Sequence, residues 1–404
     1  MTAIFAATST RLQEQVSGQK HRGKIARPAK RIAALSALAL LAACQSVIPK
    51  GGDVAGAGPK PEPIVIPADG RHQVALLLPV TGPDGDVGLS IANAAELAMA
   101  DTNSTVKINL KTYDTALGVA AAAQRAVADG NKLILGPLRG DNVVTAADIA
   151  RTKNVPIISF SNDIGVAGRN VYLLGHLPSQ SVDRIVRFAK AKGKTRFGAV
   201  VSNNVYGQRA SSNLTKSVLD AGGTLVNIQS ADDSQASVDA AVARLKAAGP
   251  MDAILIGGTG GWARTVAPSL KKAKVNGQIL GTELWNIDGG LSRTAELRGA
   301  WFASVADGYY RQFAQKYSAR YGKAPLRLSS LGYDAILLTS RVAQQWQLGT
   351  TFPITNLTDP GGFIGIDGAF RFSGNGLSER MLEVQEIRSG QFAIIEAAPG
   401  AFAK

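Results

Sequence analysis

The side chains that could act as nucleophiles, acid–base groups or metal ligands are few in this chain of 404 residues. It contains one cysteine, Cys44, and three histidines, of which only His72 and His176 lie beyond residue 43. A single thiol excludes a disulfide framework and any metal site built from several thiolates. No metal-ligand spacing surrounds His176, which we expect near a crossover between lobes, and the chain has neither a G-x-S-x-G elbow nor a G-x-x-x-x-G-K-[ST] loop. We therefore expect no enzyme, metal or cofactor, although a Ser-His-Asp arrangement of distant residues stays open.

One glycine-rich segment fits a nucleotide-binding pattern. Residues 258–263, Gly-Thr-Gly-Gly-Trp-Ala, satisfy G-x-G-x-x-A after a predicted strand, and Glu283 follows twenty residues later. Against this interpretation, the segment lies late in the chain, and the bulky Trp262 stands where the backbone would have to approach a pyrophosphate. A dinucleotide-binding enzyme is therefore the least favoured function.

Several side chains follow buried apolar runs, at the strand ends where parallel sheets bind ligands. These candidates are Arg139, Gly140, Ser159, Ser161, Asn162, Tyr206, Glu283 and Trp285. Most also have a purely structural interpretation: Ser159 and Ser161 are equally suited to capping the next turn, and Glu283 to pairing with a surface lysine. Trp285, a large aromatic flanked by Glu283 and Asn286 at a crossover, is more typical of a cleft or contact surface than of a core.

The elements that would position these side chains alternate along the chain. Short apolar runs typical of strands buried on both faces occupy residues 74–78, 106–110, 132–135, 155–159, 197–201, 224–228, 252–256 and 278–280. Helical spacing occupies residues 87–101, 116–129, 142–151, 179–191, 207–221, 237–248 and 262–272. Strands that alternate with helices form parallel sheets covered by helices. Since one sheet does not comfortably hold so many strands, the sequence predicts an α/β protein with two doubly wound lobes and an interlobe cleft.

The N-terminus has the pattern of an export signal. A basic segment at residues 27–31 precedes the apolar residues 32–43, whose length of about 18 Å as a helix is too short to cross a bilayer. Residues 41–44, Leu-Ala-Ala-Cys, resemble the lipobox of bacterial lipoproteins. The resemblance implies that residues 1–43 are removed as a signal peptide and that Cys44 becomes a lipidated first residue. Because residues 1–26 are too long for an ordinary basic region, we expect the true start codon to lie downstream.

The segment 44–71 is rich in Pro and Gly and predicts a flexible linker that holds a soluble body off a membrane. We expect an envelope protein that faces the periplasm, anchored in the outer rather than the inner membrane. The net charge of +14 falls to +8 without residues 1–43, which hold seven basic groups and one acid. The remaining excess is spread over predicted helices, so we interpret it as a solvated surface and expect no nucleic-acid partner.

The order of motifs from His72 to the C-terminus resembles type I periplasmic binding proteins of the leucine/isoleucine/valine-binding kind. The motifs that carry the resemblance are residues 74–83, 135–138, 155–162, 203–207, 281–286 and the late hairpin 361–372. It implies a first lobe of residues 72–176 plus 288–350 and a second of residues 178–285 plus 355–404.

The resemblance also implies roles for the strand-end side chains. In a site for an amino acid, Ser159, Ser161 and Asn162 would face the carboxylate, with Arg139 and Gly140 beside them. Glu283 would hold the ammonium group, and Tyr206 would form an aromatic wall. Residues 257–261, Gly-Gly-Thr-Gly-Gly, depart from the pattern, because importer proteins have a pocket-closing aromatic residue there. The missing aromatic counts against amino-acid binding.

Two branches of the family fit the sequence. The lipobox, the linker and residues 158–163 favour a penicillin-binding protein activator, which regulates peptidoglycan synthesis by contact with a cell-wall synthase. The alternative is a substrate-binding protein that delivers branched-chain or other amino acids to the permease of an ABC importer. The first implies a protein partner, and the second a small amino-acid-like ligand.

Overall fold

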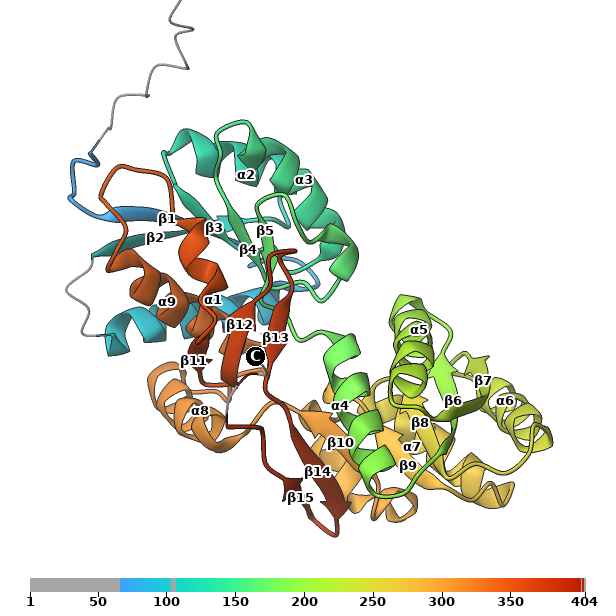
Figure 1. Cartoon of the computed structure of the whole chain (residues 1–404). Coiled ribbons are helices and arrows are strands. Elements are labelled where there is room, and N and C mark those ends of the chain that lie inside the picture. The colour runs from blue at the N-terminus through green and yellow to red at the C-terminus, as the bar shows by residue number, and fades with distance from the viewer. Residues whose placement is uncertain (1–65, 103–106, 401, 403–404) are drawn as a thin grey trace, which may run out of the picture. The chain divides into compact units, whose positions relative to one another are not determined.

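The computed structural model describes residues 66–102, 107–400 and 402, and these residues form two α/β lobes (Figure 1). The predicted signal peptide, Cys44 and most of the predicted linker lie outside the described residues. The first lobe begins with β1 (His72–Leu78), α1 (Gly85–Asp101), β2 (Ile108–Asp114), α2 (Val119–Ala128), β3 (Leu133–Leu135), α3 (Gly140–Arg151), β4 (Ile157–Ser159), the 3-10 turn η1 (Ile164–Val166) and β5 (Val171–Leu173).

The chain then crosses to the second lobe. Its elements are α4 (Pro178–Ala191), β6 (Arg196–Ser202), α5 (Val205–Asp220), β7 (Thr224–Ala231), α6 (Gln235–Ala247), β8 (Ala253–Gly257), α7 (Gly260–Lys272), β9 (Gln278–Gly281), the 3-10 turns η2 (Glu283–Ile287), η3 (Gly289–Arg293) and η4 (Ala295–Leu297), and β10 (Trp301–Ser304). All strands and helices that the sequence predicts up to residue 280 coincide with strands and helices of the two lobes. The prediction of two α/β lobes with parallel sheets is confirmed.

The rest of the chain returns to the first lobe and crosses back once more. It forms α8 (Gly308–Tyr321), α9 (Ser329–Ala343), η5 (Ile354–Thr358), β11 (Phe363–Gly365), β12 (Gly368–Phe372), β13 (Ser378–Arg380), β14 (Glu383–Arg388) and β15 (Gln391–Glu396). Two segments lie in other lobes than expected. Residues 289–304 belong to the second lobe, because β10 pairs with β9 before the chain crosses. Residues 355–380, which we expected in the second lobe, belong to the first, because Leu357 and the phenylalanines of this segment pack into its core.

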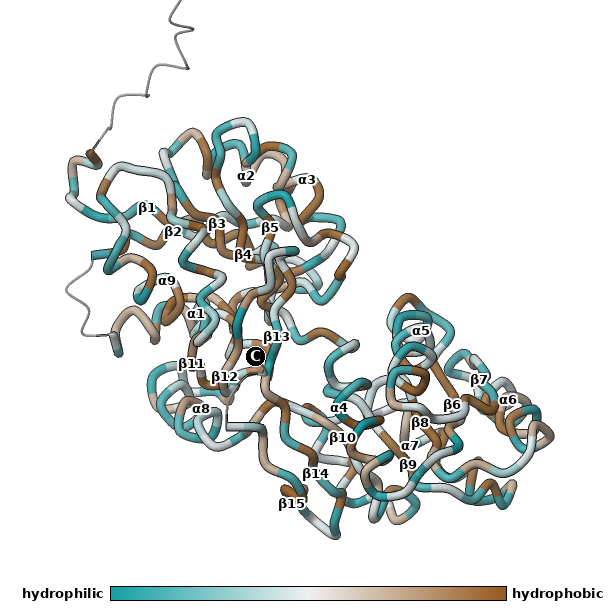
Figure 2. Tube along the Cα trace, viewed as in Figure 1, coloured by the Kyte–Doolittle hydropathy of each residue, from teal (hydrophilic) through white to brown (hydrophobic). Residues whose placement is uncertain are grey.

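Helices cover both faces of the two larger sheets, and successive strand residues point to opposite faces. The first sheet has the parallel order β2-β1-β3-β4-β5. Along β1, Leu76 and Leu78 pack with α1 and α9, whereas Ala75 and Leu77 pack with α2 and α3. Figure 2 shows the resulting concentration of hydrophobic residues along the strands.

The second sheet has the order β15-β14-β10-β9-β8-β6-β7, with β14 and β15 as an antiparallel edge. Along β8, Ile254 and Ile256 pack with α6 and α7, whereas Ala253 and Leu255 pack with α4 and α5. Three short segments join the lobes: residues 174–177, 305–307 and 381–382.

Local sequence explains why the helices start close to the strand ends. At the start of α5, the Asn204 side chain accepts a hydrogen bond from the Gly207 N–H at 3.0 Å, which is a typical N-cap. A side chain at Gly207 would collide with the backbone, since a Cβ there would lie 1.8 Å from the Ser202 carbonyl oxygen. The Tyr206-Gly207 pair therefore brings the first turn of α5 against the end of β6 and fixes the position of Tyr206.

Candidate functional site

A cavity of about 500 Å3 is lined by residues of both lobes. Most lining residues follow the carboxyl ends of β3, β4 and β5 in the first lobe and of β6, β9 and β10 in the second, and the others are Val87 of α1 and the pair Arg327 and Leu328 before α9. Of the eight candidates from the sequence, six line this cavity: Arg139, Gly140, Ser161, Asn162, Tyr206 and Glu283. The structure thus brings them together, and their contact with a ligand stays a prediction.

The two serines after β4 form a turn cap. Ser159 is fully buried, and its hydroxyl donates to the Pro137 carbonyl oxygen at 2.9 Å and accepts from the Ser161 N–H at 3.0 Å. The Ser161 hydroxyl accepts from the Asp163 N–H at 3.1 Å. Ser159 is therefore committed to the backbone and is not among the lining residues, whereas Ser161 also borders the cavity.

The start of α3 lies beside Asp163. A Cβ added to Gly140 would be 3.0 Å from Asp163 Oδ2, so this carboxylate sits directly against the first residue of the helix. The Asp163 Oδ1 accepts a hydrogen bond from the Gly165 N–H at 2.9 Å, which fixes its orientation. Arg139, just before the helix, points its largely exposed guanidinium at Asp84 at 3.2 Å.

An ion pair joins the two lobes across the cavity. Arg209 of α5 donates a short hydrogen bond to Asp163 of the first lobe. Both side chains line the cavity and are about one-third exposed. Since residues 206 and 209 are three apart on one helix, Tyr206 and Arg209 lie on the same face of α5.

Glu283 is the buried acid of the cavity, and it is 8% exposed. One carboxylate oxygen lies 2.9 Å from the Tyr206 hydroxyl, and the other accepts a short hydrogen bond from Ser181. The Tyr206 hydroxyl also lies 2.7 Å from Thr282 Oγ1. Burial raises the pKa of Glu283, and burial followed by the nearby Glu283 charge raises the pKa of Tyr206 well above its usual value. In the part of the chain that the structure describes, no Lys, Arg or His forms an ion pair with Glu283.

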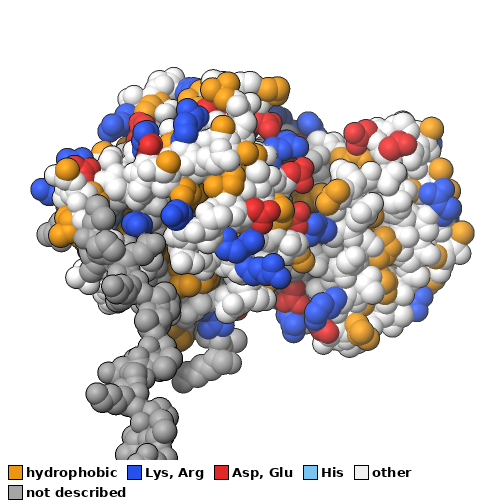
Figure 3. Space-filling view, turned by 90° about the horizontal axis from the view of Figure 1, so that it is seen from above, with side chains coloured by type: hydrophobic (Ala, Val, Ile, Leu, Met, Phe, Trp, Pro, Cys, Tyr) orange, Lys and Arg blue, Asp and Glu red, His pale blue; other side chains and the backbone are white. Residues whose placement is uncertain are grey.

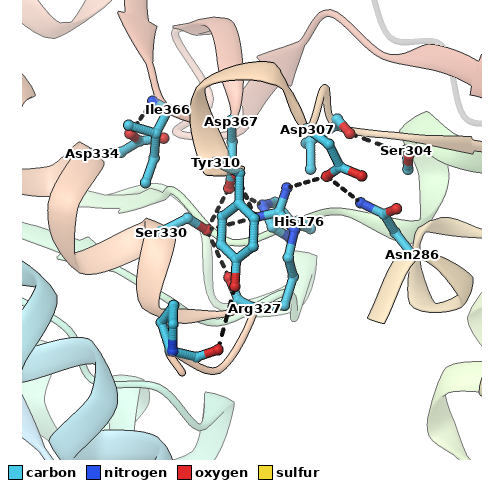
Figure 4. A network of polar contacts seen from close by, with 12 residues as sticks. His176, Asn286, Ser304, Asp307, Tyr310, Arg327, Ser330, Asp334, Ile366 and Asp367 are labelled. Atoms are coloured by element: carbon cyan, nitrogen blue, oxygen red, sulfur yellow. Dashed lines mark hydrogen bonds and ion pairs between the residues drawn. The ribbon is translucent and has the colours of Figure 1, made fainter. Parts of the chain in front are cut away.

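Beside the cavity, a charged network that the sequence did not predict ties the crossovers together (Figure 4). His176 of the first crossover lies 2.8 Å from Asp367 Oδ2. Arg327 donates to Asp367 Oδ1 at 2.5 Å and lies 3.5 Å from Asp307 of the second crossover. Ser330 donates to Asp367 at 2.6 Å. His176 and Arg327 also line the cavity, so the network and the cavity share a wall.

Two further contacts extend this hinge network, which we define as His176, Asp307, Arg327, Ser330, Asp334, Asp367 and Arg380. Arg380, just before the third crossover, donates to the Leu174 carbonyl oxygen at 2.7 Å and lies 3.9 Å from Asp334. Burial raises the pKa of Asp367, but Arg327 and His176 outweigh burial and hold it well below its usual range. Burial and the Asp367 charge raise the pKa of Asp334 to about 7. Burial lowers the pKa of His176, which favours a neutral imidazole.

Trp285 lies in the core of the second lobe, so its predicted place in the cleft is wrong. It is fully buried, with its ring 6.1 Å from that of Phe302. The cause is the 3-10 turn η2, in which residues 283, 284, 286 and 287 line the cavity and residue 285 faces the sheet. Gly281 leaves room for the ring, since a Cβ there would lie 2.3 Å from it.

The space beside the glycine-rich segment before α7 is filled by the side chains of Trp262 and Asp288, which leave no room for a nucleotide. Trp262 is buried against Gly258, where a Cβ would lie 2.5 Å from its ring. The side chain of Asp288 covers the start of α7, where a Cβ on Gly260 would lie 2.6 Å from it. This carboxylate stands where a pyrophosphate would have to bind, which removes the support for a dinucleotide site.

In residues 66–102, 107–400 and 402, no three His, Cys, Asp or Glu side chains are grouped as metal ligands. No helix in the same residues is both long and apolar enough to cross a membrane. On the face shown in Figure 3, basic and acidic side chains are interspersed, as expected for a solvated surface.

Comparison with known proteins gives one family. A family model described as periplasmic binding protein matches residues 72–353. An uncharacterized protein of Rickettsia prowazekii is 25% identical over 172 residues, which cover 42% of this chain and 46% of that protein. The match thus spans about half the length of this curated relative.

Two solved structures have a similar fold. A leucine-binding protein from Thermotoga maritima has a TM-score of 0.62 and 19% identity, with 81% of this chain and 99% of that chain covered. A protein described as a branched-chain amino acid ABC transporter from Rhodospirillum rubrum has a TM-score of 0.71 and 17% identity, with 80% and 100% covered. At these identities the likeness shows the fold alone.

Proposed function

The chain belongs to the periplasmic binding protein family, and on that premise we propose that it is the substrate-binding component of an ABC importer. It would take up a small ligand between its lobes and deliver it to a membrane permease. Family membership implies a periplasmic or envelope location. The solved structures named above, a leucine-binding protein and a branched-chain amino acid transporter, support importer function over the activator function that the sequence favoured.

One observation carries the proposal: a buried carboxylate with no cation beside it faces a cavity of ligand size. Burying an ionised carboxylate without a partner is costly, so such groups are normally paired. Among the described residues, the side-chain partners of Glu283 are the hydroxyls of Tyr206 and Ser181. A ligand ammonium group in the cavity would supply the missing positive charge and strong charge-assisted hydrogen bonds. We therefore propose that the ligand presents an amine to Glu283.

The rest of the cavity fits a ligand with an apolar body. Apolar side chains from both lobes line it, among them Leu138, Phe160, Leu284, Val305 and Leu328. Its volume of about 500 Å3 falls in the range of small-molecule sites. Residues 257–261, where importer proteins have an aromatic residue, do not line the cavity, so the apolar side chains named above would have to form the wall instead.

Calorimetry of the purified full chain tests this function. The probes are the twenty amino acids and the amines that result from their decarboxylation. We expect at least one to bind with micromolar or tighter affinity. If no probe of either set binds, the importer function is contradicted, and the activator becomes the better account.

The partner and the anchor require separate tests. Crosslinking in cells should capture a permease rather than a penicillin-binding protein, and recovery of a cell-wall synthase alone would reverse the ranking. Lipid anchoring at Cys44, in the outer membrane, remains our proposal from the lipobox. Cys44→Ala should release the protein from the membrane fraction, and unchanged retention would refute lipidation.

A further inference from the structure

The cavity contains an internal carboxylate at a place where a ligand anion could otherwise bind. The first turn of α3 has no side-chain cap, and Gly140 and Asp141 of that turn border the cavity. Free N–H groups at a helix start attract anions. Asp163 already places its carboxylate there, 3.0 Å from the position of a Gly140 Cβ. The negative charge beside the positive end of α3 is thus supplied by Asp163 of the protein itself.

Each guanidinium that lines the cavity also has an internal acid. Arg209 pairs with Asp163 across the lobes, Arg139 pairs with Asp84 at 3.2 Å, and Arg327 pairs with Asp367 at 2.5 Å. A ligand carboxylate would have to break one of these pairs and leave the displaced acid beside it. Like charges brought together in a partly buried site repel strongly.

Two other acids of the cavity, Glu283 and Asp141, have no cationic partner among the described residues. Glu283 is buried, and its side-chain partners among the described residues are the hydroxyls of Ser181 and Tyr206. Asp141, in the first turn of α3, is exposed and forms no ion pair with any described residue. The charge that the cavity lacks is therefore positive.

We propose that the cavity selects a small organic amine that carries no carboxylate, with Asp163 as the protein's own substitute for the carboxylate of an amino acid. The inference rests on the proposed function, which requires only that the ligand present an amine to Glu283. It narrows the ligand class: of two compounds with the same apolar body, the amine binds and the zwitterion is rejected. Asp163 and Arg209 are then the residues that set specificity.

The test compares matched probes on the wild-type full chain by calorimetry. 3-Methylbutylamine and leucine share an aliphatic body and differ in the carboxylate, and the other amino acids and their amines extend the comparison. We expect the best amine to bind at least ten-fold tighter than its amino acid. An amino acid that binds as tightly as its amine, or tighter, would overturn the inference and leave the proposed function standing. Failure of both probe sets would overturn the proposed function and this inference with it.

Variants identify the residue responsible. Asp163→Asn removes the internal charge and frees Arg209, so the preference for 3-methylbutylamine over leucine should shrink by at least ten-fold. Asp359→Asn removes an exposed acid that pairs with Arg341 at 3.3 Å in the same lobe, and it should leave the preference unchanged. If Asp163→Asn preserves the preference, Asp163 is not the selective group. The wild-type comparison decides the ligand class even if this variant fails to fold.

Discussion

Asp367 and Glu283 are both buried carboxylates at the junction of the lobes, but their surroundings differ in charge. Asp367 is held by Arg327, His176 and Ser330 within the hinge network. Glu283 is held by two hydroxyls and has no cation among the described residues. The pKa of Asp367 is lowered because cations lie beside it, and the pKa of Glu283 is raised because burial is not offset by a cation. A buried carboxylate with a cation beside it stabilises the native arrangement. A buried carboxylate without one favours binding of a ligand that supplies the positive charge.

The hinge network should give the largest effect on stability. Asp367→Ala would leave the Arg327 guanidinium, only 8% exposed, without its closest partner. Breaking such a buried pair from one side costs about 3–5 kcal/mol. Urea unfolding followed by tryptophan fluorescence would measure the loss. Asp359→Ala, which removes an exposed acid, is the control, and an equal loss in both variants would show that the network adds no stability.

The next largest effect should appear in the pH dependence of stability. Asp334 has a pKa of about 7 in the folded protein against an ordinary value of 3.8. Between these values the folded protein holds a proton that the unfolded chain has released, so this group costs stability as the pH rises through that range. Asp334→Asn removes the titration and should flatten the decline.

Unfolding at several pH values between about 4 and 7 would measure the slope for wild type and for Asp334→Asn. Asp148→Asn is the control, because Asp148 is an exposed acid that pairs with Arg151. Parallel curves for wild type and Asp334→Asn would contradict the raised pKa.

Glu283→Gln should change stability in the opposite direction to Asp367→Ala. The amide keeps an oxygen for the Tyr206 hydroxyl and removes a buried charge that no described residue neutralises. We expect stability to stay equal or rise by about 1 kcal/mol near neutral pH. The gain should grow as the pH rises above 4.5, the ordinary value, because the folded pKa of Glu283 is raised. A loss as large as that of Asp367→Ala would show that Glu283 is structural.

The interlobe ion pair should give the smallest effect on stability. Arg209 and Asp163 are both about one-third exposed, so solvent screens their attraction. Asp163→Asn should cost less than about 1 kcal/mol, and the cost should shrink in high salt. A larger, salt-independent loss would mean that the pair holds the lobes together rather than determining which ligand binds.

Most of the fold could be predicted from sequence because its strands are short apolar runs with clear helical spacing between them. The lobe boundaries could not, since the strand partner of residues 301–304 depends on where the chain crosses between lobes. Long-range pairing of β10 with β9, and packing of residues 363–372 against α9, leave no local sequence signal.

The candidate site was predictable where residues follow strands and unpredictable where they meet across the chain. Tyr206 and Glu283 were found, and their mutual hydrogen bond was not. Arg209, three residues after Tyr206 on one helix, could have been inferred from the helical spacing. His176 and Asp367 are 191 residues apart, so nothing local indicates their pairing. The 3-10 turn that rotates Trp285 into the core is equally invisible in the sequence.

Calorimetry with 3-methylbutylamine on three proteins tests the central claim most directly, that the unmatched charge of Glu283 binds the ligand. The proteins are wild type, Glu283→Gln and Glu296→Gln, whose Glu296 lies in the same lobe and forms an exposed pair with Lys271. Losing one partner of a buried, hydrogen-bonded charge pair costs at least about 2 kcal/mol, or about thirty-fold in affinity. The account predicts that loss in Glu283→Gln and none in Glu296→Gln. Equal affinity of wild type and Glu283→Gln would contradict it.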